Sequence, residues 1–182
     1  ASILGELSIQ AGLPPGVLNI VHGNGTDCGA EIIRHPEVPT ISFTGSTKVG
    51  QWIAGTAGPM LKRISLELGG KNPFIVFDDA DFDDAVTTAV RAGFTNQGQV
   101  CLCGSRLLVH ERIFDRFLAA YVERVKALKL GDPLDESTQQ GALVTRQHLE
   151  KVSSYVDLAR QLGGKVLSGG SPPPTLPARC KD

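Results

Sequence analysis

Short apolar runs alternate with longer segments of helical periodicity along this chain of 182 residues. The runs are five residues long, rich in β-branched or aromatic residues and bounded by Gly, Pro or Asp, which is typical of buried strands. They are Val17–Val21, Thr40–Thr44, Pro73–Phe77 and Arg106–His110. Because nearly all-apolar strands that alternate with helices form parallel sheets covered on both faces, the sequence predicts the α/β class.

Apolar residues recur at helical spacing in three segments, and we expect these stripes to pack against a core. The segments are residues 85–94 after a capping Asp81, residues 113–128, and residues 149–162 before Gly163-Gly164. Residues 3–12 show the same period, and Ser46 is well placed to cap a helix that follows it. The Gly- and Pro-rich stretch 169–174 predicts an exposed loop.

The composition favours a globular protein without a strongly charged surface. Hydrophobic residues make up 41% of the chain, charged residues 20%, and the net charge is −1. Such a balance gives no electrostatic basis for a nucleic-acid or membrane partner, and no apolar run reaches the roughly 18 residues of a membrane span. Four scattered cysteines and the lack of a signal-peptide pattern favour a reducing, cytoplasmic compartment; the cysteines are Cys28, Cys101, Cys103 and Cys180.

Two groups suited to covalent acyl chemistry lie 34 residues apart, Glu67 in Leu-Glu-Leu-Gly-Gly-Lys and Cys101 in Asn-Gln-Gly-Gln-Val-Cys. A thiol can attack a carbonyl, and a carboxylate can activate the water that releases the product. Because Leu66 and Leu68 flank Glu67, we expect this carboxylate to be partly desolvated, which favours its neutral form and suits proton exchange. The two glycines that follow leave space for a ligand close to the backbone.

Two Gly-containing turns are candidates for a phosphate site. The stretch Phe-Thr-Gly-Ser-Thr at residues 43–47 predicts a strand that ends in a turn and leads into a helix. Backbone N–H groups at such a helix start can bind phosphate. The earlier turn, residues 23–29, fails the G-x-G-x-x-G spacing because Cys28 stands where the third glycine is required. A plain strand-to-helix turn without a ligand explains that stretch equally well.

Metal and serine-hydrolase chemistry find little support in the sequence. Cys101 and Cys103 form a C-x-C pair, which lacks the second ligand pair of a zinc site. The four histidines show neither an H-x-H nor an H-E-x-x-H pattern, so we predict no metal site. The G-x-S-x-G motif of serine hydrolases is absent from the sequence.

Together the three motifs resemble the active-site signatures of the aldehyde dehydrogenase superfamily. The resemblance extends to residues 12–17, 78–81 and 131–133, and so covers almost the whole chain. It implies an α/β, aldehyde dehydrogenase-like fold: residues 1–68 end a Rossmann-type NAD(P)-binding domain, and residues 69–182 begin the α/β catalytic domain. Because Ala1 lies within a helical stretch and Asp182 follows a Pro-rich loop, we interpret the chain as an internal fragment.

This resemblance implies that Cys101 is the catalytic nucleophile and Glu67 the general base. Attack of the thiolate on an aldehyde gives a thiohemiacetal, hydride transfer leaves a thioester, and water activated by Glu67 releases the acid. The implied cofactor is NAD, with NADP left open. The residues expected beside it are Gly45 and Ser46 at the phosphates, with Thr47, Lys48, Val49, Gly50 and Leu68 around them. The family's oxyanion asparagine and ribose-binding residues lie outside this chain, so we expect these 182 residues alone to be inactive.

Residues 100–106 look more like the 2-aminomuconic semialdehyde dehydrogenase branch than the Cys-rich acetaldehyde and retinal enzymes, and so do residues 141–143, 148–156 and 176–179. The branch implies a small-molecule substrate, a semialdehyde bearing a carboxylate, in the kynurenine pathway. It also implies a homo-oligomeric parent protein.

Two alternatives stay open. Glu67 argues against a CoA-acylating aldehyde dehydrogenase, and the presence of both Cys101 and Glu67 argues against a non-catalytic NAD-binding paralogue.

Overall fold

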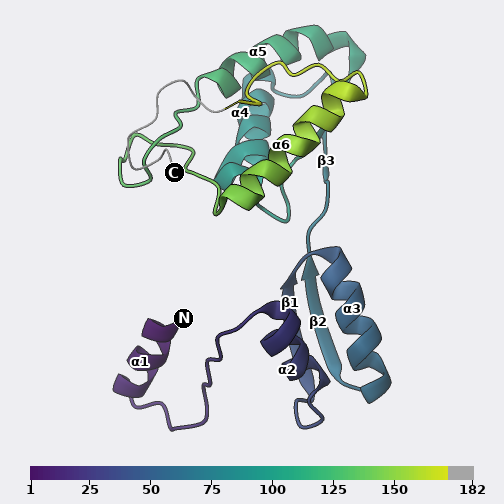
Figure 1. The fold of residues 1–182 in the computed structure, drawn as a ribbon. Helices are drawn as coiled ribbons and strands as arrows, with labels where there is room; N and C mark the ends of the chain where they lie inside the picture. Colours follow the sequence, from purple (N-terminus) through teal and green to yellow (C-terminus); the bar gives the residue numbers. More distant parts are fainter. Residues whose placement is uncertain (172–182) are drawn as a thin grey trace. The chain divides into compact units, whose positions relative to one another are not determined.

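The computed structural model describes residues 1–171 of the chain (Figure 1). The chain divides into two units, Ala1–Leu68 and Gly69–Asp182. Each unit has its own two-stranded parallel sheet and its own hydrophobic core. That the first unit belongs to a cofactor domain and the second to a catalytic domain stays a prediction.

The first unit packs two helices on one face of its sheet. Strands β1 (Thr40–Gly45) and β2 (Arg63–Leu68) pair in parallel from Thr40↔Arg63 to Gly45↔Leu68. Alternate residues of both strands join a core with α2 and α3; its members are Ile33, Val38, Ile41, Phe43, Ile53, Ala57, Ile64 and Leu66. The helical elements are α1 (Ser2–Gln10), a π-helical turn (Gly25–Gly29), α2 (Ala30–Arg34), α3 (Thr47–Ala57) and a 3₁₀ turn (Gly58–Met60).

A buried lysine closes the end of α2. Lys62 is 8% exposed, and its Nζ donates hydrogen bonds of 2.6 Å to the carbonyl oxygens of both Ile33 and His35. The last carbonyls of a helix have no partner within the helix, and the negative end of the helix dipole favours a cation there. Lys62 therefore satisfies the C-terminal end of α2 and ties it to the start of β2.

The second unit is built around strands β3 (Pro73–Val76) and β4 (Arg106–Val109), which also pair in parallel. One face of this pair packs against α4 and α5 through a core centred on Val76, Val86, Ala89 and Phe117. The ring of Phe117 stacks on Tyr121 with centroids 6.1 Å apart. The helical elements are α4 (Phe82–Phe94), 3₁₀ turns at Thr95–Gly98 and Glu111–Ile113, α5 (Phe114–Lys126) and α6 (Arg146–Gln161).

Most of the predicted elements are present, and the parallel pairing is confirmed. The runs 40–44, 73–77 and 106–110 correspond to β1, β3 and β4, and each predicted helix is found. The strand predicted at Val17–Val21 is wrong: these residues are irregular, and Val17 and Val21 are both 65% exposed. Strand β2 was missed, although Arg63–Leu68 alternates polar and apolar residues as a half-buried strand does.

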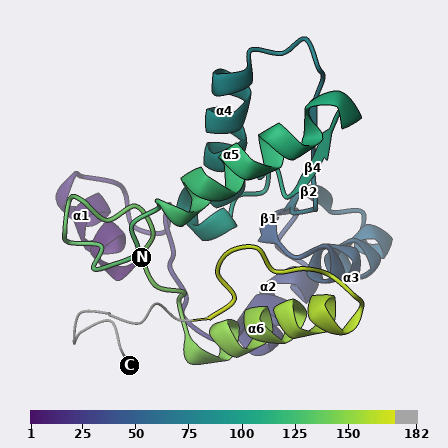
Figure 2. The same ribbon diagram turned by 90° about the horizontal axis from the view of Figure 1, so that it is seen from above.

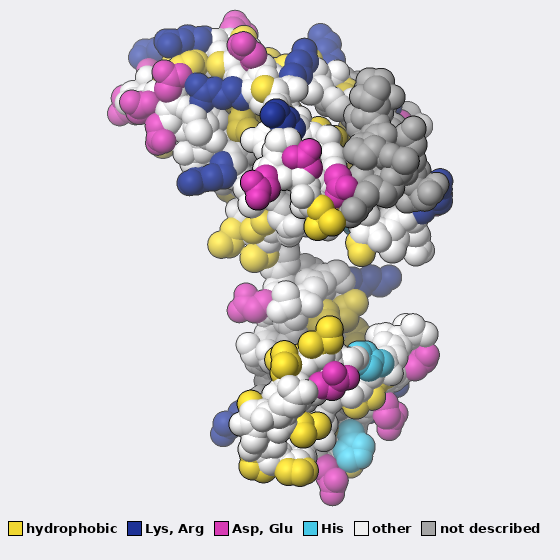
Figure 3. All heavy atoms as spheres, turned by 90° about the vertical axis from the view of Figure 1, so that its left-hand side faces the viewer, with side chains coloured by type: hydrophobic (Ala, Val, Ile, Leu, Met, Phe, Trp, Pro, Cys, Tyr) yellow, Lys and Arg dark blue, Asp and Glu magenta, His cyan; other side chains and the backbone are white. Residues whose placement is uncertain are grey.

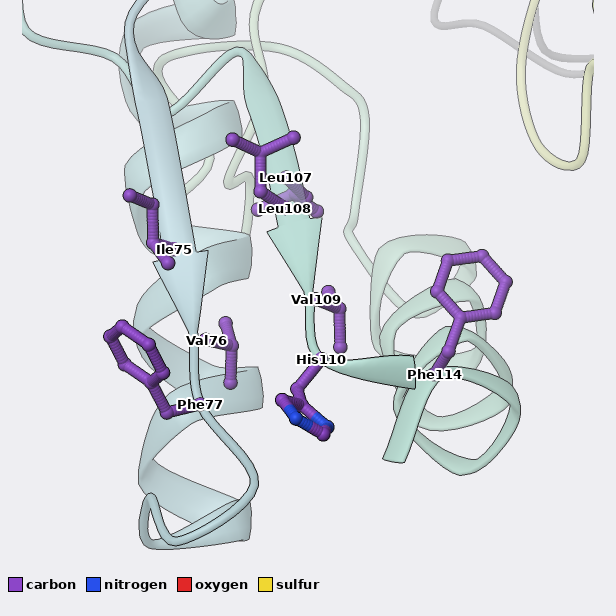
Figure 4. A pocket seen from close by; sticks show the side chains of 8 residues that line it. All are labelled: Ile75, Val76, Phe77, Leu107, Leu108, Val109, His110 and Phe114. Carbon is purple, nitrogen blue, oxygen red and sulfur yellow. The ribbon is translucent and has the colours of Figure 1, made fainter. Parts of the chain in front are cut away.

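Two expectations about burial are wrong within the described residues. The sheet of β3 and β4 is covered on one face only, and Ile75, Phe77 and Leu108 line an open apolar groove of about 400 Å³ (Figure 4). The apolar stripe of α6 is also exposed, Tyr155 by 64%, and α6 lies apart from α4 and α5 in Figure 2. Periodicity identifies a face that is suited to burial, but it does not identify the partner.

The surface carries charges of both signs. Figure 3 shows acidic and basic side chains interspersed over the second unit. Among the described residues, no helix has both the length and the hydropathy needed to cross a membrane. Of the predicted loop 169–174, residues 172–174 lie outside the described residues, as do residues 176–179 and Cys180.

We expect Lys62→Met to destabilise the first unit by about 1–3 kcal/mol, because it leaves two carbonyls at the end of α2 without their donor. Urea unfolding followed by circular dichroism measures the change. The matched control is Lys48→Met, an exposed lysine of the same unit, which should shift stability by less than about 0.5 kcal/mol. Equal effects of the two substitutions would contradict the role given to Lys62.

Candidate active site

The turn between β1 and α3 presents a helix start to open space. Ser46 caps α3, since its hydroxyl oxygen accepts a 3.3 Å hydrogen bond from the Val49 N–H. Thr47, Lys48 and Val49 are exposed, and the first turn of α3 has no acidic side chain to compete with an anion. The Val49 N–H is bonded to Ser46, whereas the N–H groups of Thr47 and Lys48 have no partner within the helix and, with the positive end of the helix dipole, can meet a phosphate.

Gly45, at the end of β1, has no room for a side chain. A Cβ added at Gly45 would lie 2.5 Å from the ring of Phe43, so any side chain here would displace that ring from the core of the first unit. The absence of a side chain also leaves the backbone open to close approach by a ligand, as a pyrophosphate requires.

Gly50 contributes close packing between α3 and β2. It is buried, and a Cβ added there would lie 2.7 Å from Cδ2 and 3.3 Å from Cγ of Leu68. Leu68 also pairs with Gly45 in the parallel register. Contacts within the fold thus connect Gly45, Gly50 and Leu68, three of the residues predicted to lie beside a cofactor.

Glu67 lies next to this group at the end of β2. Its register partner is Thr44, and its side chain is exposed, whereas Leu66 and Leu68 are partly buried. The expected desolvation of Glu67 by its sequence neighbours is therefore wrong. Successive residues of a strand point to opposite faces, so the two leucines turn away from the carboxylate.

The candidate nucleophile lies in a tight turn before β4. The Cys103 N–H donates a 3.0 Å hydrogen bond to the Val100 carbonyl, which places Cys101 and Leu102 at the corner. Cys101 is exposed, whereas Cys103 is 6% exposed. Within residues 1–171, the Cys101 N–H donates no hydrogen bond. Both the thiol and the N–H of Cys101 are thus accessible to a substrate.

The segment before this turn has an unusual backbone. Asn96 and Gln97 have φ of 51° and 56°, and Gly98 has φ of 73°. Non-glycine residues adopt the left-handed region at a cost, and such strain is frequent near functional sites. Two residues that precede the cysteine turn therefore hold a conformation that the surrounding structure has to maintain.

Residues 140–141 supply part of that support. Gln140 Nε2 donates a 2.7 Å hydrogen bond to the Phe94 carbonyl at the end of α4. The side-chain amide of Gln97 is oriented so that its nitrogen donates to the Asn96 carbonyl. Its oxygen then accepts a 2.9 Å hydrogen bond from the Gly141 N–H. A loop more than 40 residues further along the chain thereby supports the strained segment, with one bond just before it and one bond within it.

Sequence reasoning missed Asn72. Its side-chain Nδ2 donates to the Cys101 carbonyl at 2.7 Å and to the Cys103 carbonyl at 3.2 Å. The sequence Asn-Pro indicates only a turn or the start of an extended segment. Nothing in the local pattern identifies partners that lie 29 and 31 residues later in the chain.

The only described tyrosine near the cysteine turn is unsuited to act as a base. Burial raises the pKa of Tyr121 above its ordinary value, so the phenol stays neutral near pH 7. Its hydroxyl would lie 3.2 Å from a Cβ added at Gly93, on the α4 segment that leads to the turn.

Among the described residues, no three His, Cys, Asp or Glu side chains gather as metal ligands would.

The predicted site residues fall into two groups. Gly45 to Gly50, Glu67 and Leu68 meet at the carboxyl ends of β1 and β2, where open parallel sheets bind their ligands. Cys101 belongs to the second unit. The joint action of Glu67 and Cys101 therefore remains a proposal, as do all the roles of these residues.

Comparison with known proteins identifies the family. The model of the aldehyde dehydrogenase family matches residues 1–179. The chain is 48% identical over 160 residues to the 2-aminomuconic semialdehyde dehydrogenase of Bos taurus, covering 88% of this chain and 33% of that protein. It is also 48% identical over 173 residues to betaine aldehyde dehydrogenase 1 of Oryza sativa subsp. japonica, covering 95% of this chain and 34% of that protein.

Solved structures agree with the sequence matches. HpcC from Thermus thermophilus superimposes with a TM-score of 0.93 at 41% identity, over 100% of this chain and 35% of that one. A betaine aldehyde dehydrogenase from Staphylococcus aureus, solved in complex with NAD+, superimposes with a TM-score of 0.90 at 42% identity. The match covers 94% of this chain and 34% of that one. The chain belongs to the aldehyde dehydrogenase family. It spans about a third of the length of the curated relatives it matches.

We expect Gly50→Ala to destabilise the first unit by about 1–3 kcal/mol, because the new methyl group overlaps Leu68. Gly55 supplies the matched control, since it is exposed on the same helix and a Cβ there meets nothing within 4 Å. Gly55→Ala should stabilise by about 0.5–1 kcal/mol through helix propensity. Urea midpoints of the two variants measure this difference in sign, and a shared sign would refute the close packing of Gly50.

Proposed function

We propose that the full-length polypeptide carrying these residues oxidises an aldehyde to a carboxylic acid with NAD, using Cys101 as nucleophile and Glu67 as general base. The observation that carries the proposal is the cysteine turn, where Cys101 is exposed and its N–H has no hydrogen-bond partner among the described residues. Support also comes from family membership and from relatives solved in complex with NAD+.

Each candidate residue has one task in the proposed reaction. The Cys101 thiolate attacks the aldehyde carbon and forms a thiohemiacetal, while its own N–H donates to the oxygen that gains negative charge. NAD, when bound, accepts the hydride, and a thioester remains on Cys101. Glu67 removes a proton from water, which attacks the thioester and releases the acid with a free thiol.

The β1–α3 turn is the proposed place of the cofactor phosphates. Gly45 and Ser46 approach them closely, Thr47, Lys48 and Val49 surround them, and Gly50 and Leu68 support the turn from behind. In this proposal residues 1–68 end a Rossmann-type NAD-binding domain and residues 69–182 begin the α/β catalytic domain. Family resemblance supports both assignments.

The substrate class has two candidates. A semialdehyde that carries a carboxylate is favoured by 46–48% identity to 2-aminomuconic semialdehyde dehydrogenases from four vertebrates. A betaine aldehyde is the second candidate, because the betaine aldehyde dehydrogenase of rice is equally similar. The first substrate is an anion and the second bears a quaternary ammonium cation, so a single comparison of specificity constants separates them.

In the full-length polypeptide, we expect Cys101→Ser to lower kcat for NADH formation by at least about 10³-fold, since a serine hydroxyl is a far weaker nucleophile than a thiolate at neutral pH. NADH absorbance measures the rate with 2-aminomuconic semialdehyde and with betaine aldehyde. The control Cys28→Ala changes a cysteine of the first unit and should retain activity. Normal turnover by Cys101→Ser would refute the proposed nucleophile, and a higher kcat/KM for betaine aldehyde would select the second substrate class.

We expect Glu67→Gln to slow deacylation while leaving acylation intact. The steady-state rate should fall by about 10²–10⁴-fold, the usual contribution of a general base, and stopped-flow absorbance should show a burst of one NADH per active site. Glu37→Gln, an exposed glutamate of the first unit, is the control and should behave as the wild type. Loss of the burst together with the steady-state rate would contradict a role confined to hydrolysis.

A further inference from the structure

We infer that Asn72 is a positioning residue for the nucleophile, because its side-chain amide holds the carbonyls on both sides of Leu102 and thereby fixes the orientation of Cys101. This inference rests on the proposed function of Cys101. It adds a residue that contacts neither the aldehyde nor the cofactor and acts through the backbone of the cysteine turn.

The amide of Asn72 uses both of its N–H bonds on this turn. Nδ2 lies 2.7 Å from the Cys101 oxygen and 3.2 Å from the Cys103 oxygen. A primary amide has two hydrogens, so the two bonds exhaust its donor capacity. The peptide planes that follow Cys101 and Cys103 are then fixed with respect to one side chain.

Asn72 itself stands on a rigid element. Its backbone carbonyl accepts a 3.1 Å hydrogen bond from the Arg106 N–H, which continues the ladder of β3 and β4 by one step. Because the side chain projects from the end of a strand pair, its amide has a defined place from which to hold the turn.

The far side of the turn is held by α4 and does not need Asn72. The Gly104 N–H donates a 3.0 Å hydrogen bond to the Ala92 carbonyl. Gly104 is buried, and a Cβ added there would lie 3.1 Å from Cβ of Phe74 and 3.3 Å from Cβ of Ala92. The chain from Cys103 onward is therefore anchored by packing.

Cys101 has much less support. Within the described residues, the bond from Asn72 to its carbonyl is the one hydrogen bond in which Cys101 takes part. The residue is exposed, and the segment before it includes the left-handed Asn96 and Gln97. Loss of the amide would leave the nucleophile between an anchored Gly104 and a strained segment, with only the turn bond from the Cys103 N–H to the Val100 carbonyl to limit rotation of its backbone.

Such rotation would affect the chemical step more than binding. The Cys101 thiol and N–H have to face the same carbonyl group, and a misplacement of about 1 Å can reduce a rate by about 10²-fold. The amide of Asn72 does not ionise, so it holds the turn equally well with the thiol and with the thiolate.

The test compares Asn72→Asp with the wild type in the full-length polypeptide. The aspartate keeps the shape of the side chain but turns acceptors toward two carbonyls. We expect the NADH burst rate to fall about 10–100-fold, with the dissociation constant for NAD unchanged within about twofold. Alkylation of Cys101 by iodoacetamide, which needs no oxyanion contact, should change by less than about threefold. Amide hydrogen exchange at residues 99–104 should accelerate.

Asn19→Asp is the matched control, since Asn19 Nδ2 donates a 2.8 Å hydrogen bond to the Gly16 carbonyl in the first unit. An unchanged burst rate in Asn72→Asp, or an equal loss in Asn19→Asp, would overturn the inference. So would alkylation that falls as far as the burst, because the thiol would then be occluded and not misdirected. Asn72→Ser, which keeps one donor, supplies the same readouts if the aspartate variant does not fold.

Failure of the proposed function has a different signature. If the wild type oxidises no aldehyde, the proposal for Cys101 fails, and hydrogen exchange alone still decides whether Asn72 fixes the turn. Faster exchange at residues 99–104 in Asn72→Asp supports the positioning role, and unchanged exchange refutes it.

Discussion

Parallel strand pairing is the constraint on which both halves of the candidate site depend. Two parallel strands begin at the same edge of a sheet and end at the same edge, so segments far apart in sequence meet at each edge. In the first unit the carboxyl edge joins Gly45 to Leu68 and brings Glu67 beside Thr44. In the second unit the amino edge joins Asn72 to the turn before β4. The same geometry therefore brings the proposed cofactor residues together with the proposed base, and Asn72 together with the proposed nucleophile.

The parts of this arrangement that could be predicted are those that local sequence determines. A hydroxyl or carboxylate before an apolar period predicted the caps Ser46 and Asp81, and both are found, with Asp81 accepting a 2.9 Å hydrogen bond from the Asp84 N–H. Short apolar runs predicted β1, β3 and β4. The run Val17–Val21 has the same appearance but forms no strand, because a strand needs a hydrogen-bonding partner that composition does not supply.

The parts that could not be predicted depend on contacts between distant segments. The role of Asn72 becomes apparent only once β3 and β4 are paired, and the support of Gln97 comes from Gly141. The sequence predicted burial of the stripe on α6 and of both faces of the β3–β4 sheet, and the described residues leave them exposed. An apolar pattern records a preference for burial, whereas the partner is a property of the whole fold.

The exposure of Glu67 suits the hydrolytic role proposed for it. Its flanking leucines suggested a desolvated carboxylate, but alternation along β2 turns them to the opposite face, where Leu66 joins the core and Leu68 is partly buried, and leaves Glu67 exposed. A base that activates water for hydrolysis has to reach that water, and an exposed carboxylate at a strand end does so directly. Cys101 is exposed as well, as the proposed nucleophile has to be, and in that proposed role its orientation depends on backbone constraints such as the amide of Asn72. Access to solvent and fixed orientation are thus provided by different residues.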